Sequence, residues 1–412
     1  MNVRTAPSRA KEARTTALGR DLSWLTGVLW PEADVVLSPT RVPPGRRVGE
    51  AFAVIPTASH PRLLVPFSSP ALAEPAMRRY DDGMSAVARA GRSLGWRLAA
   101  SSVGWTRFPP LVVFFDREPR PDELLTQHLR SVLDRPDVVT AISFGPPRPN
   151  RKPVVQAMTL EGEVLGFGKV GWNDPTRALI RTEAAALRRW GRVRPQTFRV
   201  PRLMHEGPWR DHSIAVTSPI PTDHRLTGRP GRMPSPEVTR EIARSGGVSL
   251  MPLASTPWWR SVLDRGASGG EPTRVVLRWL AELHGRRLMW HGSWHGDWAP
   301  QNMATVEGVL HVWDWERTLD GVPLGLDPLH FCFQLVFRSR ANVSRAARVA
   351  LARSAPALRA LGVPSEDDAL LMACYLAELL VRFEEGRRFG VAMRSGMPEA
   401  LLAELRRWVA RA

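Results

Sequence analysis

Two acidic side chains and one amide stand at spacings that suit the transfer of a phosphoryl group. Asp297 ends a His-Gly-Asp triplet, Asn302 follows five residues later, and Asp314 comes directly after an apolar strand expected at residues 309–313. Mg²⁺ takes oxygen ligands, so Asn302 and Asp314 are a sufficient protein contribution to a magnesium site. Asp297 can then accept a hydrogen bond from an incoming hydroxyl. In such a reaction the protein mainly positions groups and neutralises charge.

A lysine on a second apolar strand supports the same chemistry. Lys169 lies within residues 164–170, where a buried charge requires a partner. The helix expected at residues 175–190 offers Glu183 as that partner. A strand lysine held by a helix glutamate, with its ammonium directed at nucleotide phosphates, is the second part of a kinase site. The chain has three lysines among 57 basic residues, and keeping one here fits a need for a compact point charge.

Taken together, these residues resemble the aminoglycoside phosphotransferase and choline kinase-like family. Its signature is His-Gly-Asp, an Asn five residues after the Asp, and a strand that ends in Asp-x-Glu or Asp-x-Asp. The resemblance covers residues 138–412 and implies a protein kinase-like fold with an antiparallel-sheet N-lobe and a mainly helical C-lobe. It also implies the roles: Asp297 orients and deprotonates the acceptor, Asn302 and Asp314 bind magnesium, and Lys169, held by Glu183, contacts the phosphates of ATP or GTP.

The loop where this family holds phosphate departs from the pattern. It corresponds here to residues 145–153, and its prolines each remove a backbone N–H that could bind a phosphate oxygen. Gly145 remains as a backbone contact, and Arg148, Arg151 or Lys152 could compensate through side chains. The departure leaves open a catalytically weak pseudokinase that serves as a nucleotide-binding or scaffold module.

Other residues near the motif favour structural roles. His295 is expected to brace its loop with a hydrogen bond, because the neighbouring acid does the chemistry. The spacing of His291 and His295 would suit zinc on a helix, but the glycines that follow each of them argue against a helix. Asp327 is expected to be structural by resemblance. Glu316 could support the metal or brace an arginine, and the sequence does not decide between them.

Composition bounds the class of protein. The 412 residues are 43% hydrophobic and 24% charged, which is ordinary globular chemistry and excludes a wholly disordered chain. Two cysteines exclude a disulfide framework, and no apolar run is long enough to cross a membrane. No hydrophobic segment follows the basic N-terminus, so a cytoplasmic location is expected. The net charge of +17 raises nucleic acid as a partner, but no nucleic-acid module is recognisable, so that reading ranks last.

The expected fold class is α+β, a two-lobed kinase-like fold with an additional N-terminal α/β domain. Residues 1–20 form a flexible basic tail, and residues 21–137 form the additional domain, whose role is unknown. Residues 138–221 form the nucleotide-binding N-lobe. Residues 222–412 form the C-lobe with the catalytic loop, the metal site and the acceptor site, and the stretch 222–271, rich in Gly, Pro and Ser, is interpreted as a linker or an insertion.

Apolar periodicity predicts the individual elements. Strands are expected at residues 51–56, 62–66, 110–115, 138–144, 154–160, 164–170, 214–217 and 309–313. Helices are expected at residues 82–95, 123–133, 175–190, 236–243, 272–288, 341–360, 366–385 and 398–411. The segments around Asn302 and Asp314 are close enough in sequence to form a hairpin.

The sequence therefore predicts an ATP-dependent phosphotransferase that moves the γ-phosphoryl group to a hydroxyl of a small molecule with the help of Mg²⁺. The acceptor could be a sugar, an amino alcohol or an aminoglycoside-like molecule. An aminoglycoside would favour an acidic pocket, and the basic charge balance gives no support for one. The nucleotide could be ATP or GTP, and no membrane partner is expected.

Overall fold

The chain divides into two compact units. The computed structural model describes residues 18–78, 101–145, 147, 150–220, 232–338, 342–388 and 396–412, so the helix expected at 82–95 and Arg148 lie outside the described residues. Unit 1 comprises Met1–Ile180 and Arg202–Pro219, and unit 2 comprises Arg181–Pro201 and Ile220–Ala412. The boundary falls inside helix α7 (Asp174–Val193). Unit 1 is built on a sheet and unit 2 is mainly helical, which confirms the expected α+β class.

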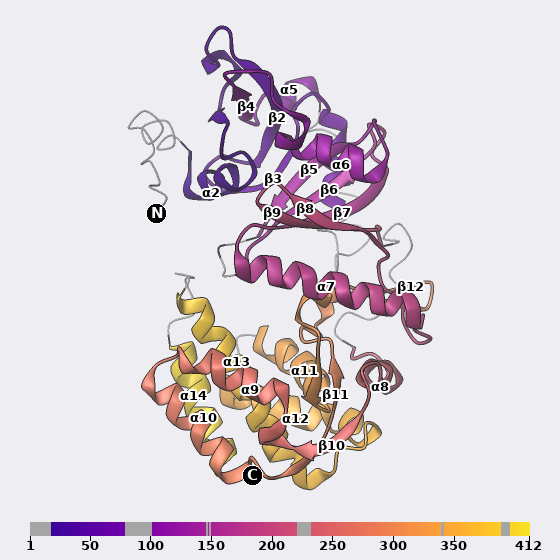
Figure 1. Ribbon diagram of the computed structural model, residues 1–412, viewed down its shortest axis with the longest axis vertical. Coiled ribbons are helices and arrows are strands. Elements are labelled where there is room, and N and C mark those ends of the chain that lie inside the picture. Colours follow the sequence, from indigo (N-terminus) through magenta and orange to yellow (C-terminus); the bar gives the residue numbers. More distant parts are fainter. Residues whose placement is uncertain are drawn as a thin grey trace. The chain divides into compact units, whose positions relative to one another are not determined.

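Unit 1 is built on one nine-stranded sheet with the strand order β1-β4-β2-β3-β5-β6-β7-β9-β8, in which every pair is antiparallel (Figure 1). The strands are β1 (Asp34–Val36), β2 (Arg47–Pro56), β3 (Pro61–Pro66), β4 (Pro110–Phe115), β5 (Val139–Phe144), β6 (Pro153–Met158), β7 (Val164–Gly171), β8 (Leu203–Trp209) and β9 (His212–Thr217). The helices are α2 (Arg20–Leu29), α3 (Ala73–Arg78), α5 (Ser102–Trp105), α6 (Leu125–Leu133) and the start of α7.

Successive apolar side chains of a strand point to opposite sides, so this sheet has two apolar faces. In β2, Phe52 and Val54 join the core formed with α2 and α6, whereas Ala53 and Ile55 join a second core formed with α3. Successive side chains of a strand point to opposite faces, so one run of apolar residues serves both cores. Burial on both faces explains why β2, β3 and β5 contain runs of apolar residues.

The expected separate N-terminal domain is not observed. Strand β3, from the segment expected to form it, pairs with β5 of the expected N-lobe through Leu63↔Ser143 and Leu64↔Ile142. Strands of both segments also share one core. The physical reason is that the edge of a sheet carries unpaired N–H and C=O groups, and pairing β3 with β5 satisfies them on both sides of the expected boundary. Residues 21–137 therefore enlarge the sheet of unit 1.

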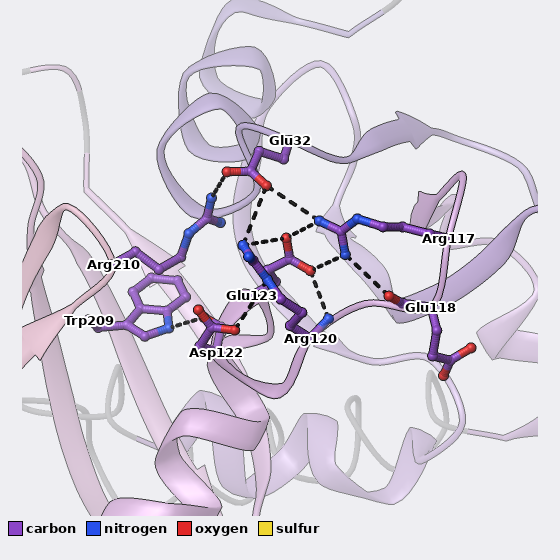
Figure 2. Close-up of polar contacts among 8 residues, drawn as sticks. All are labelled: Glu32, Arg117, Glu118, Arg120, Asp122, Glu123, Trp209 and Arg210. Carbon is purple, nitrogen blue, oxygen red and sulfur yellow. Dashed lines mark hydrogen bonds and ion pairs between the residues drawn. The ribbon is translucent and has the colours of Figure 1, made fainter.

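An ion pair and a hydrogen bond also attach the N-terminal segment to the β8–β9 turn (Figure 2). Glu32 accepts from Arg210 of that turn at 2.8 Å, and Trp209 donates its indole N–H to the carbonyl of Asp122 at 2.9 Å. Nearby, the fully buried carboxylate of Glu123 is held by Arg117 at 2.7 Å. Glu123 keeps its charge because the hydrogen bond from Arg117 lowers its pKa more than burial raises it. The contacts of Glu32 and Trp209 join the same two segments that share the sheet.

Unit 2 packs helices around a small sheet and a hairpin. Its strands are β10 (Ser249–Pro252), β11 (Leu288–Trp294) and β14 (Leu319–Pro323), which form one sheet, and β12 (Met303–Val306) and β13 (Val309–Val312), which form the hairpin. Its helices are the end of α7, α8 (Pro236–Arg244), α9 (Pro257–Ala267), α10 (Glu271–His284), α11 (Leu326–Arg338), α12 (Val343–Ala360), α13 (Asp368–Arg388) and α14 (Met397–Val409). Among the helices of the described residues, none is long and apolar enough to cross a membrane.

Two sequence predictions for unit 2 are wrong. Residues 232–271 are not a linker: besides α8, which matches the helix expected at 236–243, they contain β10 and α9, and both Trp258 and Trp259 lie fully inside the core. The helix expected at 272–288 ends at His284, because Leu288 pairs with Pro252 as β11 begins. In both cases packing and strand pairing with distant residues override the local pattern.

Candidate active site

The His-Gly-Asp loop directly follows β11, and helix α11 holds it through hydrogen bonds. The carboxylate of Asp327, in the first turn of α11, accepts hydrogen bonds from the backbone N–H groups of His295 at 2.7 Å and Gly296 at 3.1 Å. Asp327 is 5% exposed, and the two bonds satisfy donors that would otherwise be buried without acceptors. This contact agrees with the structural role expected for Asp327.

The imidazole of His295 braces the same loop. Its Nδ1 accepts from the backbone N–H of Asp297 at 3.2 Å, so its Nε2 carries the proton and donates to the carbonyl of Trp313 at 3.0 Å. The ring is fully buried and packs against Trp315. One ring nitrogen therefore braces the loop internally and the other binds it to the segment after β13, which agrees with the bracing role expected from the sequence.

The carboxylate of Asp297 is held at both oxygens. Asn302 donates its side-chain NH₂ to Oδ2 at 2.9 Å and also to the backbone carbonyl of Asp297 at 2.8 Å. His330 of α11 places Nε2 at 3.1 Å from Oδ1. Burial raises the pKa of Asp297, but the hydrogen bond from His330 and the nearby charge of Arg382 outweigh it and hold this pKa well below its usual range. Asp297 is thus a charged, oriented acceptor at neutral pH.

The hairpin β12–β13 brings Asn302 and Asp314 to one end. Asn302 directly precedes β12, and Met303 pairs with Val312, the last residue of β13. The backbone N–H of Trp313 donates to the carbonyl of Asn302 at 3.0 Å, which places Asn302 beside the start of the Asp314 segment. Asp314 itself has a left-handed backbone conformation with a φ of 67°. Residues other than glycine adopt this conformation rarely, and those that do are often at functional sites. The expected hairpin is confirmed.

Three carboxylates meet beside this end of the hairpin. The oxygens of Glu183, Asp314 and Glu316 lie within 4.8 Å of one another, and Glu183 and Glu316 are almost fully buried. Hard oxygen donors at this spacing fit a divalent cation such as Mg²⁺. The side chain of Asn302 turns its NH₂ toward Asp297, which leaves its amide oxygen as the atom that could face a cation. The residues present therefore fit a magnesium site.

Cations from α13 and from the segment after Asp314 surround the loop. Arg382 donates to the carbonyl of Gly296 at 2.8 Å and is held by Glu378 at 2.7 Å. Burial lowers the pKa of Arg317, and the neighbouring charge of Arg382 lowers it further, while Glu316 and Asp297 raise it. Asp297 therefore lies near two arginines, each of which faces a carboxylate: Glu378 beside Arg382 and Glu316 beside Arg317.

The expected nucleotide-binding residues of unit 1 lie on β7 and on the loop between β5 and β6. Lys169 is on β7, paired with Val154 of β6 and Ala215 of β9. Arg151 makes an ion pair with Asp21 at 2.8 Å. Its guanidinium also lies over the ring of Trp24 at 4.1 Å from the ring centre, so Arg151 fastens the loop to α2.

Two further residues complete this set. The ammonium of Lys152 donates to the carbonyl of Asn150 at 3.2 Å, and Gly145 directly follows β5. Contacts of Gly145, Arg151, Lys152 and Lys169 with phosphate, and the pairing of Lys169 with Glu183, stay predictions.

Three residues that support the His-Gly-Asp loop were not predicted from the sequence: one contacts Asp297, one contacts that first residue, and one donates to Gly296. His330, Tyr375 and Arg382 come from α11 and α13, far along the chain from Asp297. One signal was present: His330 stands three residues after Asp327 and therefore on the same face of a helix. That position could have been read as a second contact from α11 to the loop.

Comparisons with known proteins find similarity only among solved structures. No family model matches the chain, and no curated protein matches its sequence. A thermostable mutant of aminoglycoside phosphotransferase APH(4)-Ia has a TM-score of 0.45 and 11% identity, over 70% of this chain and 99% of that one. The amicoumacin kinase hAmiN, solved with AMP-PNP, Ca²⁺ and Ami, has a TM-score of 0.42 and 12% identity, over 66% and 88%.

A choline/ethanolamine kinase family protein from Mesorhizobium loti has a TM-score of 0.39 and 14% identity, over 64% of this chain and 88% of that one. All three TM-scores are below 0.5, so the function proposed below rests on the residues of this chain. By their names, these three structures are a phosphotransferase, a kinase and a kinase family protein.

Proposed function

We propose that the protein transfers the γ-phosphoryl group of ATP or GTP to a hydroxyl of a small molecule. The observation that carries this proposal is the double role of Asn302. Its side chain holds the carboxylate of Asp297, and its backbone carbonyl binds the segment that leads into Asp314. An oriented carboxylate and a group of oxygens suited to a cation are thus joined through one residue, an arrangement that supports phosphoryl transfer.

In the proposed reaction Asp297 accepts a hydrogen bond from the acceptor hydroxyl and orients its oxygen. That oxygen forms a bond to the γ-phosphorus, and the bond from this phosphorus to the bridging oxygen of the β-phosphate breaks. The hydroxyl proton passes to a carboxylate oxygen of Asp297 and then to solvent. Because the pKa of Asp297 is held low, this residue is a weak base whose main contribution is orientation and negative charge.

Asn302 and Asp314 would hold Mg²⁺, with Glu316 and Glu183 beside them. When bound there, Mg²⁺ supplies positive charge that stabilises the phosphate oxygens. Lys169 would contact the nucleotide phosphates, a role that rests on the resemblance alone. The two arginines near Asp297, Arg382 and Arg317, favour a sugar or another neutral alcohol over a polycationic aminoglycoside.

The variant Asp297→Ala tests the proposal. We expect a loss of phosphoryl transfer of about 10²-fold or more with nucleotide affinity unchanged, because the variant removes the group that orients the acceptor. Purified protein is incubated with ATP or GTP, Mg²⁺ and a panel of hydroxylated metabolites and antibiotics, and both ADP or GDP release and the phosphorylated product are measured. Asp264→Ala, which changes an exposed acid of α9, is the matched control.

Two results would count against this function. Turnover by Asp297→Ala at the rate of the unaltered protein would remove Asp297 from the reaction. Nucleotide binding by the unaltered protein without transfer to any acceptor would instead support the pseudokinase reading, which the prolines of the loop at 145–153 keep open.

A further inference from the structure

A histidine and a tyrosine form a buried chain of hydrogen bonds behind Asp297. His330 of α11 places Nε2 at 3.1 Å from Oδ1 of Asp297, and its Nδ1 lies 3.1 Å from the hydroxyl of Tyr375 on α13. His330 is 4% exposed and Tyr375 is 1% exposed, so water does not compete for these bonds. The ring of Tyr375 is fixed in turn by an edge contact with Phe333. The chain therefore connects the helical core of unit 2 to the loop.

With a neutral imidazole, one arrangement of hydrogens satisfies all three groups. The carboxylate of Asp297 can only accept, so Nε2 of His330 carries a hydrogen and donates it. Burial lowers the pKa of His330 more than Asp297 raises it, and the charges of Arg382 and Arg317 lower it further, so the imidazole is neutral. Its Nδ1 then accepts from Tyr375, whose hydroxyl stays protonated because burial raises its pKa well above the usual value. Tyr375 thus selects the tautomer of His330.

His330 lies on the same face of α11 as Asp327, which also holds the loop. Asp327 and His330 are three residues apart on one helix and therefore share a face. Asp327 holds the backbone of the loop through His295 and Gly296, while His330 holds the side chain of Asp297. A single turn of α11 thus fixes both the path of the loop and the direction of its carboxylate.

We propose that His330, kept in one tautomer by Tyr375, is a positioning residue that sets the orientation of the Asp297 carboxylate toward the acceptor hydroxyl. The proposal rests on the proposed function. His330 and Asn302 each donate to a different oxygen of Asp297, which prevents rotation of the carboxylate. Each oxygen keeps a second acceptor site for a substrate hydroxyl. Because the neutral His330 donates without adding a charge, Asp297 retains its full negative charge.

Three variants separate positioning from packing. His330→Leu removes the donor and keeps an apolar filling, and we expect kcat to fall about tenfold to a hundredfold while KM for the nucleotide stays unchanged. His330→Gln places an amide N–H near the position of Nε2, and we expect kcat within about threefold of the unaltered protein. Tyr375→Phe frees the tautomer and is expected to lower kcat by about twofold to tenfold, the value of one net hydrogen bond. His284→Leu, at a histidine that contacts the carbonyl of Val409, is the matched control.

The tautomer is measured separately from activity. Long-range ¹H–¹⁵N spectra of the full chain without substrates should show a protonated Nε2 and an unprotonated Nδ1 for His330, and Tyr375→Phe should change the Nδ1 shift. Circular dichroism confirms that each variant is folded. These spectra test the chain of hydrogen bonds even if no acceptor is phosphorylated, so failure of the proposed function is distinguishable from failure of this inference.

Three results would overturn the inference. The first is a proton on Nδ1, or an imidazolium, in the spectra at neutral pH. The second is a kcat of His330→Leu equal to that of the unaltered protein. The third is a kcat of His330→Gln as low as that of His330→Leu, since packing alone would then explain the effect.

Discussion

Replacement of Glu378 by glutamine should weaken unit 2 in a way that depends on pH. Glu378 of α13 is 3% exposed and accepts from Arg265 at 2.6 Å and from Arg382 at 2.7 Å. Arg382 in turn donates to the carbonyl of Gly296 in the loop that carries Asp297. The carboxylate therefore supports the loop through one intermediate side chain. Glutamine keeps the size of the side chain and removes its charge.

The magnitude follows from the pKa of the carboxyl. Burial raises the pKa of Glu378, but the charges of Arg382 and Arg265 and their hydrogen bonds outweigh it and lower the pKa from 4.5 to about 2. One pKa unit corresponds to about 1.4 kcal/mol, so the charged form contributes about 3 kcal/mol to folding. Removing one partner of a buried ion pair costs about 3 to 5 kcal/mol, which agrees in size. We expect Glu378→Gln to lose about 3 kcal/mol at pH 7.

The sign of the pH dependence is set by the lowered pKa in the folded state. The contribution of Glu378 is fully present above the unfolded value of about 4.5 and is lost as the pH falls from there to about 2. The difference in unfolding free energy between Glu378→Gln and the unaltered protein should therefore shrink below pH 4.5. Urea unfolding, monitored through hydrogen exchange of the peptide that covers α13, measures this difference at several pH values.

The exposed Glu399 of α14 provides the control, because Glu399→Gln makes the same chemical change on the surface of the same unit. This control should change the unfolding free energy by less than about 0.5 kcal/mol. A difference for Glu378→Gln that is absent at pH 7, or that keeps its size down to pH 2, would refute the reasoning from its pKa.

Two further predictions concern the same unit. Asp327→Ala leaves the backbone N–H groups of His295 and Gly296 buried without acceptors, and it should lower the free energy of unfolding by roughly 2 to 6 kcal/mol in the same urea experiment; a variant as stable as the unaltered protein would show that the loop does not need this contact. Asp314→Asn should raise the Mg²⁺ concentration for half-maximal transfer about tenfold or more. Mutation of a group that only hydrogen-bonds to a metal ligand already lowers metal affinity by about that factor. An unchanged Mg²⁺ requirement in a titration of activity would exclude Asp314 as a ligand.

Segments defined by local patterning were predicted well. The strand expected at 110–115 coincides with β4, and the strand expected at 164–170 differs from β7 by one residue. The hairpin between Asn302 and Asp314 was also expected, because its two segments are close in sequence. In the structure its strands are joined by two residues, Glu307 and Gly308, which both have positive φ. Contacts of this kind depend on neighbours a few residues away, so their signal is present in any short window of sequence.

Contacts between distant segments were not predictable in the same way. The pairing of β3 with β5 joined two expected domains into one sheet, and the burial of Trp258 placed an expected linker in the core. Apolar runs report that a segment is buried but not which segment covers it. The partner of a strand edge or of a tryptophan is chosen among many apolar surfaces by the packing of the whole unit.

The candidate site shows both contributions. Sequence alone determined the identity and spacing of Asp297, Asn302 and Asp314, because the His-Gly-Asp loop and the hairpin are short-range structures. Only the tertiary structure decided that His330 and Tyr375 stand behind the carboxylate, since these residues follow Asp297 by 33 and 78 positions. Side chains so far apart in sequence meet only when α11 and α13 pack together, and the free energy for that contact comes from the apolar core of unit 2.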